Sequence, residues 1–172
     1  EAFNASKDRK VGLLVDTGAY DNLCGTESSW FREHLQYLNS LGMIPGVRDI
    51  QEVNVHGVGS GAAKATQALE FQGAILDNGG NAELMSFDTP IVAGSTIPPL
   101  LGLTSLRRMK AFIDCKGLTL HLLGEGDLKL TLPPGSKTYK MELIDGHLIL
   151  PMGEFETLKQ QIHQGVTSKK LA

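Results

Sequence analysis

An aspartate followed by two small residues, Asp16-Thr17-Gly18, closes the apolar run at residues 11–15. That run has the pattern of a buried strand, so the carboxylate is expected where a strand leaves the core and turns. Two carboxylates held close together in such a place share one proton, and the pair can then activate a water molecule. The triplet occurs once in the 172 residues. A paired site would therefore need two copies of the chain.

Two further segments lie at long spacing from this triplet. Residues 57–61 read Gly-Val-Gly-Ser-Gly between polar alternating segments, and residues 98–102 read Pro-Pro-Leu-Leu-Gly. Glycine-rich loops can bind phosphate, but residues 57–61 do not match the dinucleotide fingerprint, and residues 59–64 lack the Gly-Lys-Ser/Thr ending of a P-loop. Phosphate binding is therefore disfavoured, and by itself the segment is typical of a surface hairpin.

Short alternating segments separated by turn residues dominate the chain and predict strands. Leucines alternate with polar residues at 118–122 and 128–132, and both segments are predicted as half-buried strands. Turns or breaks are predicted at residues 77–81, 116–117, 133–135 and 145–146, the last within a tight hairpin.

Helices are the exception in this sequence. Ser28 or Ser29 can begin a helix that ends before Gly42, and its expected buried face contains Trp30, His34, Leu38 and Leu41. A weaker helix is expected within residues 153–163. The fold class is therefore mainly β with one or two short helices.

Composition excludes several classes of partner. The net charge is -3 and most basic residues are scattered, so nucleic acid is not an expected partner. No run approaches the roughly 18 apolar residues of a membrane helix, and residues 1–10 lack the apolar segment of a signal peptide. We expect a soluble, intracellular, cytoplasmic protein. The spacing of Cys24 and Cys115 predicts no metal site, and both are expected to be buried or half-buried thiols.

Three of these segments together resemble a known family. Asp16-Thr17-Gly18-Ala19, the glycine-rich residues 57–61 and the Pro-Pro-Leu-Leu-Gly at 98–102 have the order found in retropepsins, the single-domain aspartic proteases of retroviruses and retrotransposons. The resemblance spans roughly residues 11–123. It implies an acid-protease-like closed barrel, a flap hairpin over residues 53–65, and a short helix opened by Gly102. Residues 1–123 would form the protease domain, and residues 124–172 an extension of it with strands and a short helix.

The resemblance also implies an activity and roles for residues. The protein would be a homodimeric aspartic endopeptidase that processes a retroelement polyprotein, without metal or cofactor. Asp16 of each chain would form the catalytic pair, the Thr17 hydroxyl would brace the opposite loop, and Gly18 would admit the substrate backbone. The residues expected to bind substrate are Ala19, Asp21, Gly57, Val58, Gly59, Pro98 and Leu100. Leu100, Leu101 and Gly102 would pack beneath the loop that carries Asp16.

The sequence departs from the family in two places. Retroviral members usually pair an acidic residue at the position of Tyr20 with an arginine at the position of Leu103, and both are absent here. Asp21 is the expected substitute for part of that role. The predicted helix over residues 29–41 is an insertion relative to the usual family pattern. Two alternatives remain open: a retropepsin-like binding or dimerisation module without proteolysis, and a cellular protease of the same fold.

Overall fold

The computed structural model describes residues 12–58 and 61–152 of the chain. The fold is mainly β, with 44% strand and 13% helix. The chain divides into two compact units, Glu1–Leu128 and Lys129–Ala172. The elements in chain order are β1 (Leu14–Asp16), β2 (Cys24–Gly25), α1 (Ser29–Ser40), β3 (Gly46–Val58), β4 (Gly61–Leu76), β5 (Ala82–Val92), β6 (Leu100–Gly102), α2 (Leu103–Arg108), β7 (Ala111–Asp114), β8 (Thr119–Leu122), β9 (Glu142–Ile144) and β10 (His147–Ile149).

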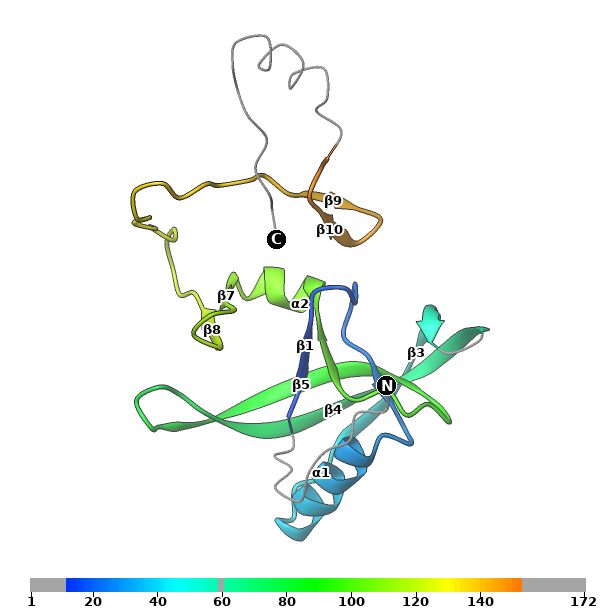
Figure 1. Cartoon of the computed structure of the whole chain (residues 1–172). Helices are drawn as coiled ribbons and strands as arrows, with labels where there is room; N and C mark the ends of the chain where they lie inside the picture. Colours follow the sequence, from blue (N-terminus) through cyan, green and yellow to red (C-terminus); the bar gives the residue numbers. More distant parts are fainter. Residues whose placement is uncertain (1–11, 59–60, 153–172) are drawn as a thin grey trace. The chain divides into compact units, whose positions relative to one another are not determined.

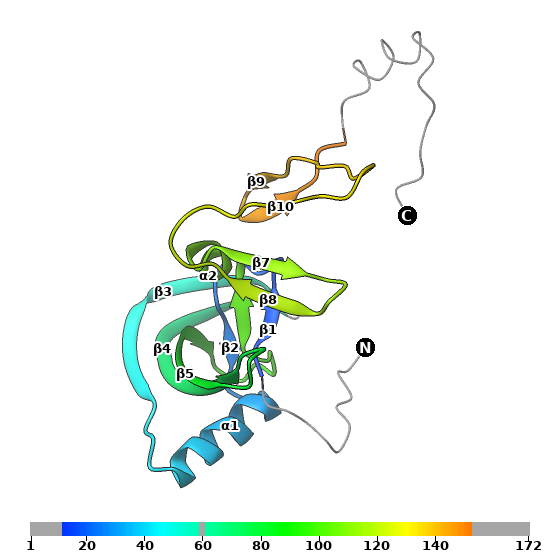
Figure 2. The ribbon, with the colours of Figure 1, turned by 90° about the vertical axis from the view of Figure 1, so that its left-hand side faces the viewer.

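A four-stranded sheet in the order β2-β5-β4-β3 forms the main layer of the first unit. Strands β3, β4 and β5 are antiparallel neighbours, whereas β2 runs parallel to β5. These three long strands curve strongly, as Figures 1 and 2 show. The predicted turn at residues 77–81 joins β4 to β5, and the Asn81 N–H donates to Asp77 Oδ1 at 2.7 Å. No closed barrel is found among the described strands.

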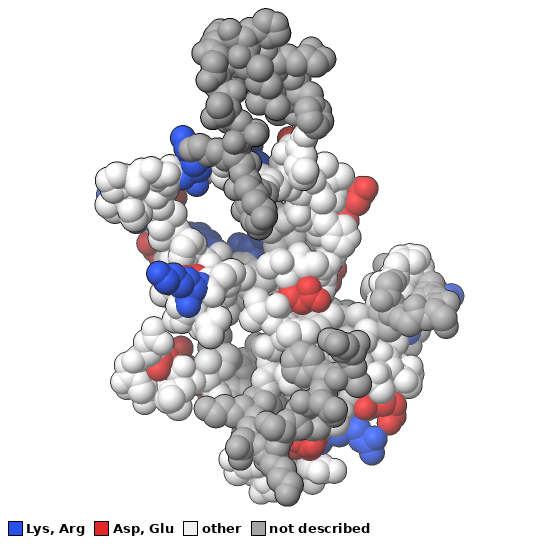
Figure 3. All heavy atoms as spheres, in the orientation of Figure 1, with Lys and Arg blue, Asp and Glu red and all other residues white. Residues whose placement is uncertain are grey.

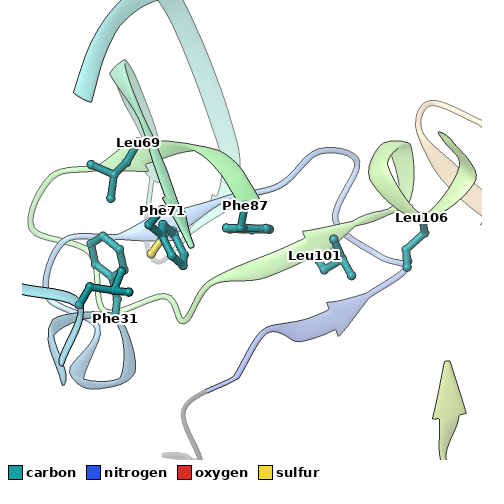
Figure 4. Packing of buried hydrophobic residues seen from close by; sticks show 8 residues of the cluster. Phe31, Leu69, Phe71, Phe87, Leu101 and Leu106 are labelled. Carbon is teal, nitrogen blue, oxygen red and sulfur yellow. The ribbon is translucent and has the colours of Figure 1, made fainter. Parts of the chain in front are cut away.

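Helix α1 covers one face of this sheet because its apolar side chains meet three aromatic or aliphatic positions of β4 and β5 (Figure 4). Phe71 lies at the centre, with its ring centroid 5.5 Å from that of Phe31 and 5.2 Å from that of Phe87. The His34 ring meets Phe71 edge-on and hydrogen bonds through Nε2 to the Gln72 carbonyl oxygen at 2.6 Å.

The buried face of α1 differs from the prediction. Phe31 and Leu38 are its buried residues, whereas Trp30 is half-buried and Leu41 is exposed. The helix ends at Ser40, so Leu41 already belongs to the turn that leaves it. The helix itself was predicted correctly.

The same core extends to the short strand and helix in the second half of the unit. Leu101 in β6 and Leu106 in α2 belong to the cluster that also contains Cys24 and Phe87. Strand β6 is buried along its whole length. Strand β6 is therefore anchored in the main hydrophobic core of the first unit.

Strands β7 and β8 form a hairpin around the predicted turn at residues 116–117. The leucines near β8 were predicted to be half-buried, but Leu118, Leu120 and Leu122 are exposed. Cys115 is also exposed because it lies in this turn, which corrects the expectation for that thiol, whereas Cys24 is fully buried.

The second unit contains one described hairpin, β9–β10. Its two-residue turn places Asp145 at φ 48° and Gly146 at φ 83°, the conformation that an Asp-Gly hairpin turn favours. The predicted strand at residues 128–132 is absent, since that segment has no partner strand among the described residues and its leucines are exposed. No side chain is buried within the described residues 129–152. The helix expected within 153–163 lies outside the described residues.

Within the described ranges, no helix has both the length and the apolar content needed to cross a membrane.

Candidate functional site

The loop of residues 16–23, which we call the Asp loop, begins where β1 ends. Its aspartate carboxylate is oriented by the loop's own backbone. The Gly18 N–H donates to Asp16 Oδ1 at 2.8 Å, and the Ala19 N–H donates to the same oxygen at 3.2 Å. Asp16 is half-buried, and its Oδ2 makes no hydrogen bond with the described residues. One carboxylate oxygen is therefore fixed and the other remains available to a ligand.

Strand β6 supports both ends of the Asp loop. It runs parallel to β1, with Asp16 in register with Gly102. It also bridges to Leu23 at the far end of the loop, where the Leu100 N–H donates to the Leu23 carbonyl at 2.8 Å. The loop therefore starts and finishes on one buried strand, which limits how far its carboxylate can move.

The start of α2 supports the middle of the loop. The Leu103 N–H donates to the Ala19 carbonyl at 2.8 Å, and the Thr104 N–H donates to the Tyr20 carbonyl at 2.9 Å. These N–H groups belong to the first turn of α2, where backbone donors have no partner within the helix. The loop carbonyls satisfy them.

Gly102 lies so close to the Asp loop that a side chain has no room. A Cβ atom there would overlap the carbonyl group of Asp21 and lie 2.9 Å from the Asn22 nitrogen. The expected packing of residues 100–102 beneath the Asp loop is thus present in the structure.

The structure brings together only part of the predicted site. Asp16, Thr17, Gly18, Ala19 and Asp21 lie in the Asp loop. Leu100 is the register partner of Leu14, and Pro98 precedes the Pro99 carbonyl that accepts the Leu14 N–H at 2.8 Å. Thr17, Gly18 and Asp21 are exposed.

The predicted flap is a hairpin of β3 and β4 with Val58 opposite Gly61. Gly57 and Val58, which were predicted to form the hairpin tip with Gly59, belong to strand β3, and Gly59 lies outside the described residues. No hydrogen bond joins the described part of this hairpin tip to the Asp loop.

One residue of the loop was missed in the sequence. The Asn22 carboxamide accepts from the Gly102 N–H through Oδ1 at 2.9 Å and donates through Nδ2 to the Asp88 carbonyl at 2.9 Å. The available signal was its residue type, since a carboxamide can bridge a backbone donor and a backbone acceptor. Nothing local in the sequence identifies the two partners.

Charge and ligand chemistry add little to the site. Across the described residues, no group of three His, Cys, Asp or Glu side chains is placed to hold a metal ion. On the described part of the face in Figure 3, acidic and basic side chains form small groups separated by uncharged surface. This distribution differs from the continuous basic stripe that phosphate backbones require.

Comparison with known proteins finds no family model that matches the chain and no curated protein whose sequence matches it. The resemblance to retropepsins therefore depends on the residues quoted above.

Proposed function

We propose that this protein is a retropepsin-like aspartic endopeptidase that acts as a homodimer and processes a retroelement polyprotein. The observation that carries the proposal is the Asp loop. Asp16 ends a strand, its Oδ1 accepts two backbone N–H groups, and its loop is fixed at both ends on β6. These contacts orient the carboxylate.

A single carboxylate is not sufficient for the chemistry. Hydrolysis of a peptide bond without metal or covalent intermediate needs one group that accepts a proton from water and another that donates a proton to the carbonyl oxygen. Two Asp16 side chains, one from each copy, would share one proton and supply both groups. Thr17 is exposed and Asp16 Oδ2 makes no hydrogen bond with the described residues, which supports a second copy at this position.

The reaction then follows from the shared proton. The ionised carboxylate accepts a proton from water as the water oxygen bonds to the peptide carbonyl carbon, and the neutral carboxyl donates its proton to the carbonyl oxygen. The tetrahedral diol collapses when the carboxyl that accepted the water proton donates it to the amide nitrogen. The C–N bond then breaks, and the other carboxylate accepts a proton from one hydroxyl of the diol, which becomes the carbonyl oxygen of the new carboxyl product. Both carboxyl groups return to their starting state.

The substrate would lie in extended form against the Asp loop. Gly18 is exposed and has no side chain to obstruct a peptide backbone. The residues proposed to contact the substrate are Ala19, Asp21, Gly57, Val58, Gly59, Pro98 and Leu100. The curvature of β3, β4 and β5 supports, as part of the same proposal, the acid-protease-like barrel and a flap formed by the hairpin tip.

The test is cleavage of a peptide library by the purified chain at several pH values, read by mass spectrometry. Asp16→Asn should lower turnover by about 100-fold or more, since removal of a general acid or base has effects of this order. Asp127→Asn, the same change at an exposed aspartate outside the site, should leave turnover unchanged. A statine-type transition-state mimic should inhibit, a chelator should not, and dilution should lower specific activity.

Two results would overturn the proposal: full turnover by Asp16→Asn, or full specific activity under conditions where the chain is monomeric. A chain that forms dimers but cleaves nothing would instead favour a binding or dimerisation module.

A further inference from the structure

The Asn22 side chain connects three parts of the chain that are distant in sequence. Its Oδ1 accepts from Gly102 at the junction of β6 and α2, and its Nδ2 donates to the Asp88 carbonyl in β5. Both distances are 2.9 Å, which is typical of a well-formed N–H···O hydrogen bond. The bond with Gly102 is partly buried, so water competes less for it than for the exposed bond to Asp88.

Asp88, whose backbone carbonyl accepts from Asn22, also takes part in an ion pair through its side chain. The Asp88 carboxylate forms two hydrogen bonds with the Arg48 guanidinium of β3, at 2.7 Å and 2.6 Å. This pair is exposed and adds little stability, but its two-point geometry orients Asp88. A continuous polar path therefore runs from β3 through Asp88 and Asn22 to Gly102.

The charged pair that retroviral members usually carry is absent from this chain. Tyr20 and Leu103 supply neither a carboxylate nor a guanidinium, so they cannot form that ion pair. Asp21, the expected substitute, is exposed and makes no side-chain hydrogen bond or ion pair with the described residues. Asn22 is the loop side chain that reaches the β6–α2 junction.

We propose that Asn22 is a positioning residue for the reaction: its carboxamide fixes the Asp loop on β5 and on the β6–α2 junction and so sets the orientation of the Asp16 carboxylate. The inference rests on the proposed endopeptidase function. Asn22 and Asp16 are connected through a single residue. Gly102 donates its N–H to the Asn22 carboxamide, and it is also the register partner of Asp16.

The test compares three variants with the wild-type chain on a peptide that the wild type cleaves. Asn22→Leu removes both hydrogen bonds, and Asn22→Asp keeps the acceptor for Gly102 but loses the donor to Asp88. Asn81→Leu is the matched control, because it deletes carboxamide hydrogen bonds to Asp77 in the turn before β5. The kcat of each variant is measured at a temperature below its thermal unfolding midpoint. The protein concentration is kept in the range where specific activity does not change with dilution.

Asn22→Leu should lower kcat on the order of 10- to 100-fold with little change in KM, as expected when reacting groups are misplaced rather than substrate binding lost. Asn22→Asp should retain an intermediate kcat, and Asn81→Leu should equal the wild type. Independently of activity, the Gly102 amide should exchange with solvent faster in Asn22→Leu than in the control.

The inference fails if Asn22→Leu has wild-type kcat, if its loss only follows the unfolded fraction, or if Gly102 exchange is unchanged. If Asn22→Leu does not fold, the same comparison of kcat is made with Asn22→Asp, and a wild-type kcat in that variant overturns the inference. Failure of the proposed function looks different: the wild type cleaves nothing, or Asp16→Asn cleaves as well as the wild type. Either result removes the positioning role together with the reaction.

Discussion

Replacement of Gly102 by alanine tests the close approach between β6 and the Asp loop. Gly102 has φ -80° and ψ 168°, an extended conformation that alanine adopts without strain. The change therefore acts through contact alone. The added Cβ would overlap the carbonyl group of Asp21 and would lie 2.9 Å from the Asn22 nitrogen. Both are backbone atoms, so no side-chain rotation can relieve the overlap.

The expected cost follows from that geometry. Overpacking of a well-packed site costs about 1–3 kcal/mol. The upper part of this range applies because the loop is tied down by the hydrogen bonds from Leu103 and Thr104 to its carbonyls. In a chain of this length, a loss of about 2–3 kcal/mol lowers the Tm by roughly 4–12 °C.

Gly73→Ala is the matched control, since a Cβ at Gly73 in β4 would meet nothing within 4 Å. A glycine whose backbone suits alanine gains up to about 1 kcal/mol from this change, through the unfolded state. Urea unfolding of both variants measures the difference. Equal midpoints with equal m-values for Gly102→Ala and Gly73→Ala would refute the inferred overlap.

Four further expectations concern the thiols, the core and a turn. A chromogenic disulfide reagent should modify the exposed Cys115 in the native chain and the buried Cys24 only after unfolding. Burial raises the pKa of Cys24 to about 12 from 9.0, so the folded thiol stays protonated where the unfolded one ionises. The contribution of Cys24 to the free energy of unfolding should be constant below pH 9 and should fall as pH rises toward 12. Cys24→Ala should remove that fall when urea midpoints are measured against pH. Phe71→Ala should cost about 3–5 kcal/mol in urea unfolding because it empties the centre of the aromatic cluster. Hydrogen bonds from the Asn81 backbone and side chain lower the pKa of Asp77, so this turn should lose order as pH falls through that pKa. The loss should appear as a lower protection factor of the Asn81 amide, that is, exchange compared with the intrinsic rate at the same pH, and Asp77→Ala should remove this pH-dependent fall.

Features determined by nearby residues could be predicted from the sequence. The turn at residues 77–81 and the Asp145-Gly146 hairpin depend on turn chemistry within a few positions, and both are present. Helix α1 was predicted from a serine start and apolar spacing. Its exact buried face depended on the sheet below it, which is why Phe31 and not Trp30 is buried.

Features that depend on distant partners could not be derived from local pattern. Residues 128–132 alternate like a strand, but alternation supplies no partner for its backbone, and no strand forms. The parallel pairing of β1 with β6 was not predicted, because three-residue strands carry no local signal for each other; the family resemblance implied only that residues 100–102 pack beneath the Asp loop. The bridge made by Asn22 could not be foreseen for the same reason: its partners lie 66 and 80 positions away.

That separation has a consequence for how the protein is made. A ribosome delivers the acid-bearing segment long before the strand that holds it, since the contact between Asn22 and Gly102 spans 80 positions. Closure of so long a span is entropically costly and slow compared with the pairing of adjacent strands. During synthesis, the loop that carries the Asp16 carboxylate therefore lacks its supporting strand until Gly102 and the first turn of α2 have been made.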